Sequence, residues 1–251
     1  MPPVADHVAK APELEPMEAY RIWARAYPAL AHNALMLAEE RATLSLIPRS
    51  LRDTKVLDAG CGTGRYLLHA LRRRATSLVG VDPSPEMLQR GRVELARFSA
   101  SAEPQDAGTS AGTNAVVHWV RGRLESLPIT ADWADVTICA LAIGHVPELQ
   151  PALAELRRVT RPGGAIICSD FHPIGHSLGW QRTFSVDGHT YAVRHIPHAR
   201  EEWKRACSAL NLKMVEVLEP TLDLADVPAG ARFDRSALAR PVVVVYQLTA
   251  A

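Results

Sequence analysis

Short β-prone runs alternate with helical segments from Lys55 to Asp170. Five apolar runs follow one another along the chain: KVLDA, SLVGVD, VVHWV, DVTICAL and GAIICSD. Segments with apolar groups at helical spacing follow the first, second and fourth of them. Strands that alternate with helices form a parallel sheet with helices on both faces, and right-handed crossovers make that sheet doubly wound. We therefore expect an α/β fold built around a parallel sheet.

The segment before this unit differs in composition. Residues 1–16 carry four prolines and few large apolar groups, so we expect a flexible tail. Residues 17–50 have apolar groups at helical spacing, interrupted by Pro28, which predicts two helices that meet at Pro28 and together form an N-terminal helical lid. Residues 51–251 then make up the main domain.

Two features interrupt the alternation within this domain. The small and polar residues 99–115 predict a disordered surface loop. Residues 171–198 contain two β-prone runs on either side of Asp187-Gly188, a pair that strongly favours a hairpin turn. We expect this hairpin to be an insert on the substrate side of the domain. A helix at residues 199–210 and the runs LKMVEVLE and PVVVVYQL complete the chain.

The composition excludes several classes of partner. A net charge of +1 over 251 residues provides no field to attract nucleic acid or an anionic membrane. No apolar run approaches the ~20 residues that span a bilayer, and the first residues lack the order of a secretory signal. We expect a cytoplasmic protein. The four cysteines show no CxxC spacing, so neither a zinc site nor a disulfide framework is expected.

The stretch VLDAGCGTGRY is a glycine-rich turn directly after the first β-prone run. Ligands of parallel sheets bind at the carboxyl ends of the strands, which is where this turn lies. A dinucleotide fingerprint would require glycine at the position of Arg65. Asp58 precedes the glycines, and Asp82 ends the second run, where an acid can accept both hydroxyls of a ribose. These acids favour a nucleoside without phosphates and with a cationic group.

Five stretches in order carry a family resemblance: VLDAGCGTGRY, LVGVDPSPEML, GRLESLPI, ADVTICALAIGHV and ELRRVTRPGGAIICSD. Together they resemble the motifs of class I S-adenosylmethionine-dependent methyltransferases, in the branch of quinone-biosynthesis, malonyl-carrier and natural-product enzymes. The resemblance covers about residues 17–170 well. It implies a Rossmann-like sheet of about seven strands, mostly parallel, with an antiparallel last strand. It also implies S-adenosylmethionine as the cofactor and S-adenosylhomocysteine as its product.

The resemblance assigns cofactor contacts by position. The turn would hold the methionine part, Asp82 the ribose, and the residues after Asp82 and around Leu124 the adenine, with aromatic residues of the N-terminal helices closing over them. The implied cofactor-binding residues are Tyr20, Tyr27, Asp58, Gly60, Cys61, Gly62, Thr63, Gly64, Asp82, Pro83, Met87, Arg123, Leu124, Glu125 and Ala140. Arg123 stands where many relatives carry an acid, and an arginine cannot accept a hydrogen bond from adenine. Either Arg123 turns to solvent or it packs across the adenine.

The acceptor side of the cofactor is expected at the ends of the fourth and fifth runs. A hydroxyl acceptor needs a general base, and the candidate catalytic residues there are His145, Asp170 and His172. A packing or helix-capping role for His145 is the alternative. Six of the ten histidines lie between residues 145 and 198. The hairpin residues expected to line the substrate pocket are His176, Trp180, Phe184, Tyr191 and His195.

Two of the histidine pairs have spacings that could bind a metal on a helix, His172 with His176 and His195 with His198. Prolines and a glycine interrupt both pairs, so no metal site is expected. The predicted function is methylation of a small organic acceptor, at oxygen with assistance from His and Asp, by a monomer or a homodimer. Methylation of a carboxylate, carbon or nitrogen of a small or carrier-bound metabolite is the alternative. A non-methylating cofactor-binding protein and a nicotinamide dehydrogenase are alternatives of other classes.

Overall fold

A seven-stranded sheet forms the centre of the protein. The computed structural model describes residues 10–101, 115–222, 227 and 237–250. The strands of the sheet, from one edge to the other, are β4 (Val116–Arg121), β3 (Ser77–Asp82), β2 (Lys55–Ala59), β5 (Ala134–Ala140), β6 (Thr160–Phe171), β10 (Val243–Ala250) and β9 (Leu212–Leu218). The first five are parallel, and β10 runs antiparallel to both of its neighbours. The predicted Rossmann-like α/β fold with an antiparallel last strand is confirmed.

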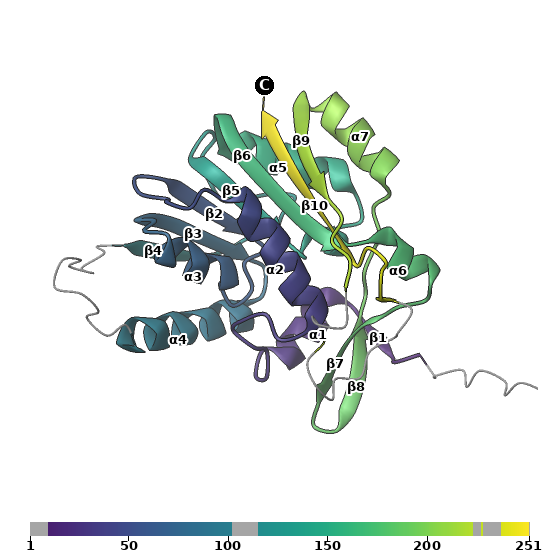
Figure 1. Ribbon diagram of the computed structural model, residues 1–251. Helices are drawn as coiled ribbons and strands as arrows, with labels where there is room; N and C mark the ends of the chain where they lie inside the picture. The colour runs from purple at the N-terminus through teal and green to yellow at the C-terminus, as the bar shows by residue number, and fades with distance from the viewer. Residues whose placement is uncertain (1–9, 102–114, 223–226, 228–236, 251) are drawn as a thin grey trace, which may run out of the picture.

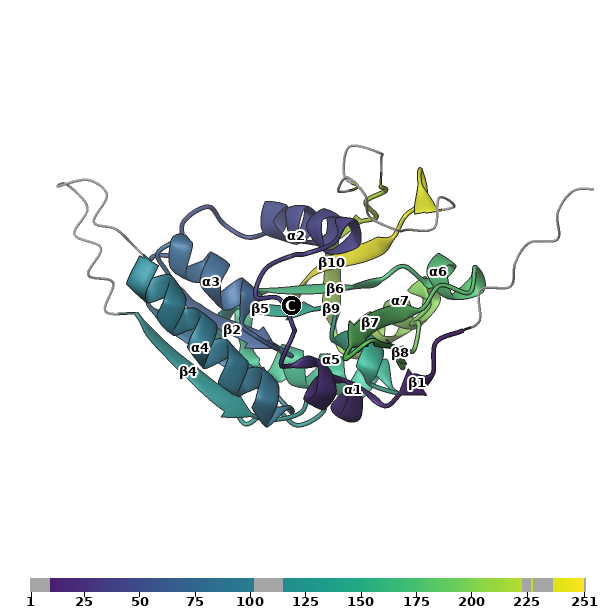
Figure 2. The same ribbon diagram turned by 90° about the horizontal axis from the view of Figure 1, so that it is seen from below.

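Helices cover both faces of this sheet (Figures 1 and 2). The helices on one face are α2 (Ala34–Leu46), α3 (Arg65–Arg72) and α4 (Pro85–Ser101), and those on the other are α5 (Leu149–Val159) and α7 (Arg200–Ala209). Neighbouring strand residues point to opposite faces, so Val56 packs in the core beneath α3, whereas Leu57 packs in the core beneath α5 and α7. Burial on both faces explains why the central strands are continuous apolar runs.

The strand order reverses between β2 and β5. From β2 the chain crosses to β3 on one side, and β5 lies on the other side of β2. The loops after these strands therefore diverge and leave a crevice at the carboxyl ends, which is the usual ligand position in an open α/β sheet. The glycine turn follows β2 directly and opens α3 at Arg65.

The N-terminal helices differ from the prediction. Helix α1 (Pro16–Trp23) ends before Pro28, and α2 begins only after Asn33, so the two helices do not meet at Pro28. The Asn33 side chain accepts a hydrogen bond from the Met36 N–H at 2.9 Å, and this cap sets the start of α2. Helix α2 packs on β10 and β6, and its Met36 lines the cavity described below.

The predicted hairpin is present as β7 (Arg182–Val186) and β8 (His189–Val193). Its two turn residues, Asp187 and Gly188, have φ values of 51° and 78°, as a tight two-residue turn of this kind requires. A short strand, β1 (Glu13–Leu14), pairs in parallel with β8. This part of the segment expected to be a loose tail is therefore paired, because β8 offers it a free edge.

Helix α1 and the hairpin form one packed unit below the sheet in Figure 1. Its buried residues, here called the lid cluster, are Ala19, Trp23, Phe184 and Val193. The rings of Trp23 and Phe184 stack with their centroids 4.7 Å apart. Short helix α6 (Pro173–Ser177) links the end of β6 to this unit. A 3₁₀ turn, η1 (Ile143–His145), follows β5 and contacts the unit through His145 and Tyr20.

Two further points concern the loop expected at residues 99–115 and the character of the helices. The loop expected at residues 99–115 lies largely outside the described residues. Its first three residues, 99–101, are helical and form the end of α4. Within the described ranges, no helix has the length and apolar character needed to cross a bilayer.

Candidate functional site

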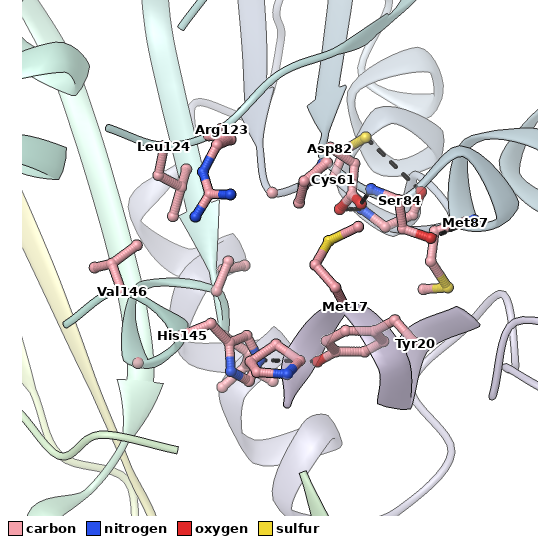
Figure 3. A pocket seen from close by; sticks show the side chains of 18 of the residues that line it. Met17, Tyr20, Cys61, Asp82, Ser84, Met87, Arg123, Leu124, His145 and Val146 are labelled. Atoms are coloured by element: carbon pink, nitrogen blue, oxygen red, sulfur yellow. Dashed lines mark hydrogen bonds between the residues drawn. The ribbon is translucent and has the colours of Figure 1, made fainter. Parts of the chain in front are cut away.

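A cavity of about 350 Å³ lies at the carboxyl ends of β2, β3 and β5. Figure 3 shows Cys61, Asp82 and Ser84 on one side of it and His145 with Tyr20 on another, with Met17 of α1 projecting between them. The sheet provides the floor, and α1 with the residues after β8 provides the cover. The cavity is thus bounded by the lid as well as by the strand ends.

The glycine turn brings backbone to the cavity wall. Gly60 and Gly62 both have positive φ values, 75° and 53°. A Cβ atom on Gly60 would lie 2.5 Å from the Cβ atom of Ala142, the residue that opens η1. Only glycine lets the turn after β2 approach the loop after β5 this closely, and this approach closes the floor of the cavity.

Asp82 binds the glycine turn as well as facing the cavity. Its Oδ2 accepts a hydrogen bond from Gly62 N–H at 2.8 Å, and its Oδ1 accepts one from Ser84 N–H at 2.8 Å. Burial raises the pKa of Asp82 to about 6, although both hydrogen bonds act to lower it. Each oxygen keeps lone-pair capacity for a ligand hydroxyl.

Asp58 is the second buried acid beside the turn. Its Oδ2 is buried and has no hydrogen-bond partner among the described residues. Burial raises the pKa of Asp58 to about 7 against the opposing charge of Arg65, and the nearby Asp82 and Glu39 carboxylates contribute to this rise. A cationic ligand group near Asp58 would compensate this carboxylate.

Fourteen of the fifteen predicted cofactor residues line the cavity. The exception is Gly64, the N-cap of α3, which has φ 80° and packs where a Cβ would lie 2.4 Å from the Trp119 ring. The guanidinium of Arg123 extends towards the cavity in Figure 3 and lies 3.8 Å from Glu125, with its side chain 71% exposed. Cavity residues that sequence reasoning missed include Met17, Met36, Arg65, Tyr66, Ser84 and Arg182.

A buried polar network supports the turn from α2. Glu39 is fully buried and accepts hydrogen bonds from Tyr66 Oη at 2.8 Å and Ser169 Oγ at 2.6 Å. Arg65, the first residue of α3, donates to Glu39 at 2.6 Å and to Glu40 at 3.0 Å. The network joins α2, α3 and β6 behind the glycine turn. Sequence periodicity alone places Glu39 on a helix without revealing that it is buried.

Three polar side chains converge at the far side of the cavity, and we call them the acceptor wall: Tyr20, His145 and Arg182. The Nε2 atom of His145 lies 3.0 Å from Tyr20 Oη and 3.0 Å from an Arg182 guanidinium nitrogen. His145 Nδ1 lies 3.2 Å from the carbonyl oxygen of Arg194, which can only accept, so Nδ1 carries the proton. Burial and the Arg182 charge hold the pKa of His145 well below its usual range. The ring is neutral and presents the Nε2 lone pair.

The other two candidate catalytic residues lie outside this cavity. Asp170 is buried at the end of β6, and its Oδ1 lies 2.8 Å from His195 Nε2 and accepts from Phe171 N–H. His172 caps α6, since its Nδ1 accepts from the Ile174 N–H at 3.2 Å. Neither residue lines the cavity wall. The pairing of each with its own neighbours leaves His145 as the candidate that faces the cavity.

The five residues expected to line a substrate pocket also lie outside the cavity. Phe184 stacks on Trp23 in the lid cluster, and Tyr191 packs beside Phe184 at 5.7 Å. Trp180 packs against Gly175, His176 is exposed on α6, and His195 binds Asp170. The hairpin contributes Arg182 to the cavity, while its aromatic residues serve packing.

Comparisons with known proteins agree with the architecture. A family model described as a methyltransferase domain matches residues 57–168. Among similar curated relatives, the malonyl-[acyl-carrier protein] O-methyltransferase of Serratia marcescens is 31% identical over 69% of this chain and 59% of the relative. The ubiquinone/menaquinone biosynthesis C-methyltransferase of Methylobacterium nodulans is 30% identical over 72% of this chain and 67% of the relative. The chain thus spans about two thirds or less of the length of these relatives.

Solved structures share the fold at low sequence identity. An S-adenosylmethionine-dependent methyltransferase from Mesorhizobium loti has a TM-score of 0.61 and 20% identity, over 84% of this chain and 97% of that one. The geranyl diphosphate C-methyltransferase of Streptomyces coelicolor, in complex with S-adenosyl-L-homocysteine, has a TM-score of 0.62 and 14% identity, over 86% of this chain and 76% of that one. With the domain match, the relative that is 30% identical over two thirds of its length shows that the chain belongs to the class I S-adenosylmethionine-dependent methyltransferases.

Proposed function

We propose that the protein transfers a methyl group from S-adenosylmethionine to an oxygen atom of a small organic acceptor that binds against Tyr20, His145 and Arg182. One observation carries the proposal. These three polar side chains converge within hydrogen-bond distance on the wall of the same cavity that the glycine turn and Asp82 border. An acceptor bound there would lie next to the cofactor without leaving the enclosed space.

The residues of the cavity fit the cofactor. The unpartnered Oδ2 of Asp58 suits a cationic group, and the glycine turn allows close approach of the methionine part. Asp82 would hold the ribose hydroxyls, and Met87 with Leu124 would pack against the adenine. When bound, S-adenosylmethionine supplies an electrophilic methyl group on a sulfonium.

His145 would accept the acceptor's proton. Its neutral ring holds a hydrogen on Nδ1 through the Arg194 carbonyl, so Nε2 is the atom that can receive a hydrogen bond or a proton. A hydroxyl acceptor that takes the place of one present partner of Nε2 would donate to that nitrogen. A positioned base of this kind typically contributes about 10²–10⁴-fold to the rate.

Labelled cofactor and a panel of phenols, hydroxy acids and amines test the proposal. We expect label on an oxygen of at least one small acceptor, and a loss of about 10²-fold in kcat for His145→Gln with unchanged affinity for S-adenosylhomocysteine. The matched control is His118→Gln on the exposed side of edge strand β4, which should retain full activity. Label transfer to protein or RNA alone would overturn the proposal.

A further inference from the structure

Four arginines line the cavity, and Arg182 differs from the other three. Arg65 pairs with Glu39 and Glu40, Arg123 with Glu125, and Arg194 with Glu15 at 2.6 Å. Among the residues that the structure describes, none places a carboxylate within salt-bridge distance of Arg182. The acceptor wall therefore carries a positive charge without a counter-ion.

Arg182 is nevertheless held in a defined place. One guanidinium nitrogen donates to the Leu141 carbonyl at 3.1 Å and approaches His145 Nε2 at 3.0 Å. The guanidinium also lies over the Tyr20 ring at 5.6 Å and the Phe171 ring at 5.2 Å. In the part of the chain that the structure describes, hydrogen-bond partners contact only one of its nitrogens, so the rest of the guanidinium's donor fork is available to a ligand.

The hydrogen bonds at His145 also indicate that this wall has donors available for a ligand. Nε2 of this tautomer has a single lone pair, yet both Tyr20 Oη and Arg182 lie 3.0 Å from it. Burial raises the pKa of Tyr20 above its usual range, so its hydroxyl keeps its proton. Two donors compete for one acceptor, and the wall has one donor too many until an oxygen atom of a ligand arrives.

We propose that the acceptor is a hydroxy acid whose carboxylate binds Arg182 and Tyr20, while its hydroxyl donates to His145 Nε2. This inference rests on the proposed function and adds the chemical class of the acceptor. The carboxylate accepts from both of these donors and neutralises Arg182, and their departure from Nε2 frees the lone pair that the hydroxyl needs. A charge-assisted bond to a guanidinium is about twice as strong as a neutral one and can be bidentate, which favours an acid over its amide.

Binding of matched acids and amides tests the inference. The probes are the 2-, 3- and 4-hydroxybenzoates and the corresponding hydroxybenzamides, titrated into protein saturated with S-adenosylhomocysteine and followed by calorimetry. We expect at least one acid to bind tenfold or more tightly than its amide, and Arg182→Gln to abolish that difference. Arg182→Lys, which keeps the charge but not the fork, should retain part of it. The control Arg205→Gln, on the exposed side of α7, should leave it unchanged.

A second readout separates the possible failures. Arg182→Gln should keep its melting temperature and its affinity for S-adenosylhomocysteine. If it weakens S-adenosylhomocysteine but not a decarboxylated analogue, Arg182 serves the cofactor's own carboxylate and the inference is wrong. If acids and amides bind alike and both are methylated at oxygen, the inference fails while the proposed function stands. If the acids bind through Arg182 but no oxygen is methylated, the carboxylate site stands and the proposed function fails.

Discussion

The Nε2 atom of His195 lies 2.8 Å from Oδ1 of Asp170, and this pair fastens the segment after β8 onto the end of β6. The adjacent backbone lies across η1, where Ile196 N–H donates to the Gly144 carbonyl at 2.8 Å. The carbonyl of Arg194 in the same segment fixes the tautomer of His145. Asp170 and His195 therefore position the acceptor wall from outside the cavity.

Gly144→Ala should disturb this arrangement. A Cβ at Gly144 would lie 2.1 Å from His195 Nε2 and 2.7 Å from Asp170 Oδ2, so the segment that carries the Arg194 carbonyl must move. We expect about a tenfold loss of kcat and a destabilisation of about 1–3 kcal/mol, the usual cost of overpacking. Urea unfolding and steady-state kinetics measure both. Gly163→Ala, at a positive φ with open space around it, should cost stability without reducing kcat. Equal losses of kcat in both variants would contradict a positioning role for the segment that carries the Arg194 carbonyl.

Tyr20→Phe should affect the acceptor and spare the cofactor. The substitution removes one of the two donors near His145 Nε2 and keeps the ring that lies beneath Arg182. Because a hydrogen bond to a charged group contributes about 1.5–3 kcal/mol, we expect the affinity for the acceptor to fall about tenfold or more. The dissociation constant of S-adenosylhomocysteine should stay within about twofold. A variant that loses S-adenosylhomocysteine binding instead would show that the hydroxyl contacts the cofactor.

The contribution of Asp58 and Asp82 to the stability of the ligand-free protein should decrease as the pH rises from about 4 to about 7. The folded pKa values of Asp58 and Asp82, about 7 and about 6, lie above the ordinary value of 3.8, so these two carboxyls bind more protons in the folded state than in the unfolded state across this window. The lowered pKa of His145 acts in the opposite direction. Urea unfolding at several pH values measures the slope. Asp58→Asn should make the slope less negative, since the amide does not titrate, whereas Asp187→Asn in the exposed hairpin turn should not change it.

Glu39→Gln should destabilise the fold strongly. The substitution removes the buried charge that pairs with Arg65 and leaves the guanidinium with Glu40 alone. Removing one partner of a buried ion pair typically costs about 3–5 kcal/mol, so we expect a loss of about 3 kcal/mol in unfolding free energy. Arg97→Ala, which breaks an exposed pair with Glu94, should cost at most about 1 kcal/mol. A loss below about 1 kcal/mol for Glu39→Gln would show that the network contributes little to stability.

The position of the glycine turn and Asp82 at the cavity could be predicted because the signals for it are local. The glycine turn, Asp82 and the strand ends follow from backbone conformation and from the parallel sheet, and a short stretch of sequence encodes each of them. The double role of Asp82, which also accepts from Gly62 and Ser84, could not be predicted, because it depends on how closely the turn approaches β3.

Which hairpin residues face the cavity could not be predicted in the same way. Arg182 is one of many arginines, and only the packing of the hairpin against Tyr20 and Phe171 directs it into the cavity. Conversely, Phe184 and His195 belong to a histidine- and aromatic-rich hairpin, yet the lid cluster and Asp170 engage them. Residue type alone does not distinguish a side chain that faces a ligand from one that completes a core.

The pairing of β1 with β8 has a consequence for how the chain is made. Glu15 and Arg194 stand 179 residues apart, and the strand before Glu15 has no partner until the hairpin exists. A ribosome that adds about 5–20 residues per second exposes β1 for roughly 9–36 seconds before β8 is synthesised. The strand β1 therefore stays without its sheet partner until the hairpin that contributes Arg182 to the cavity has been synthesised.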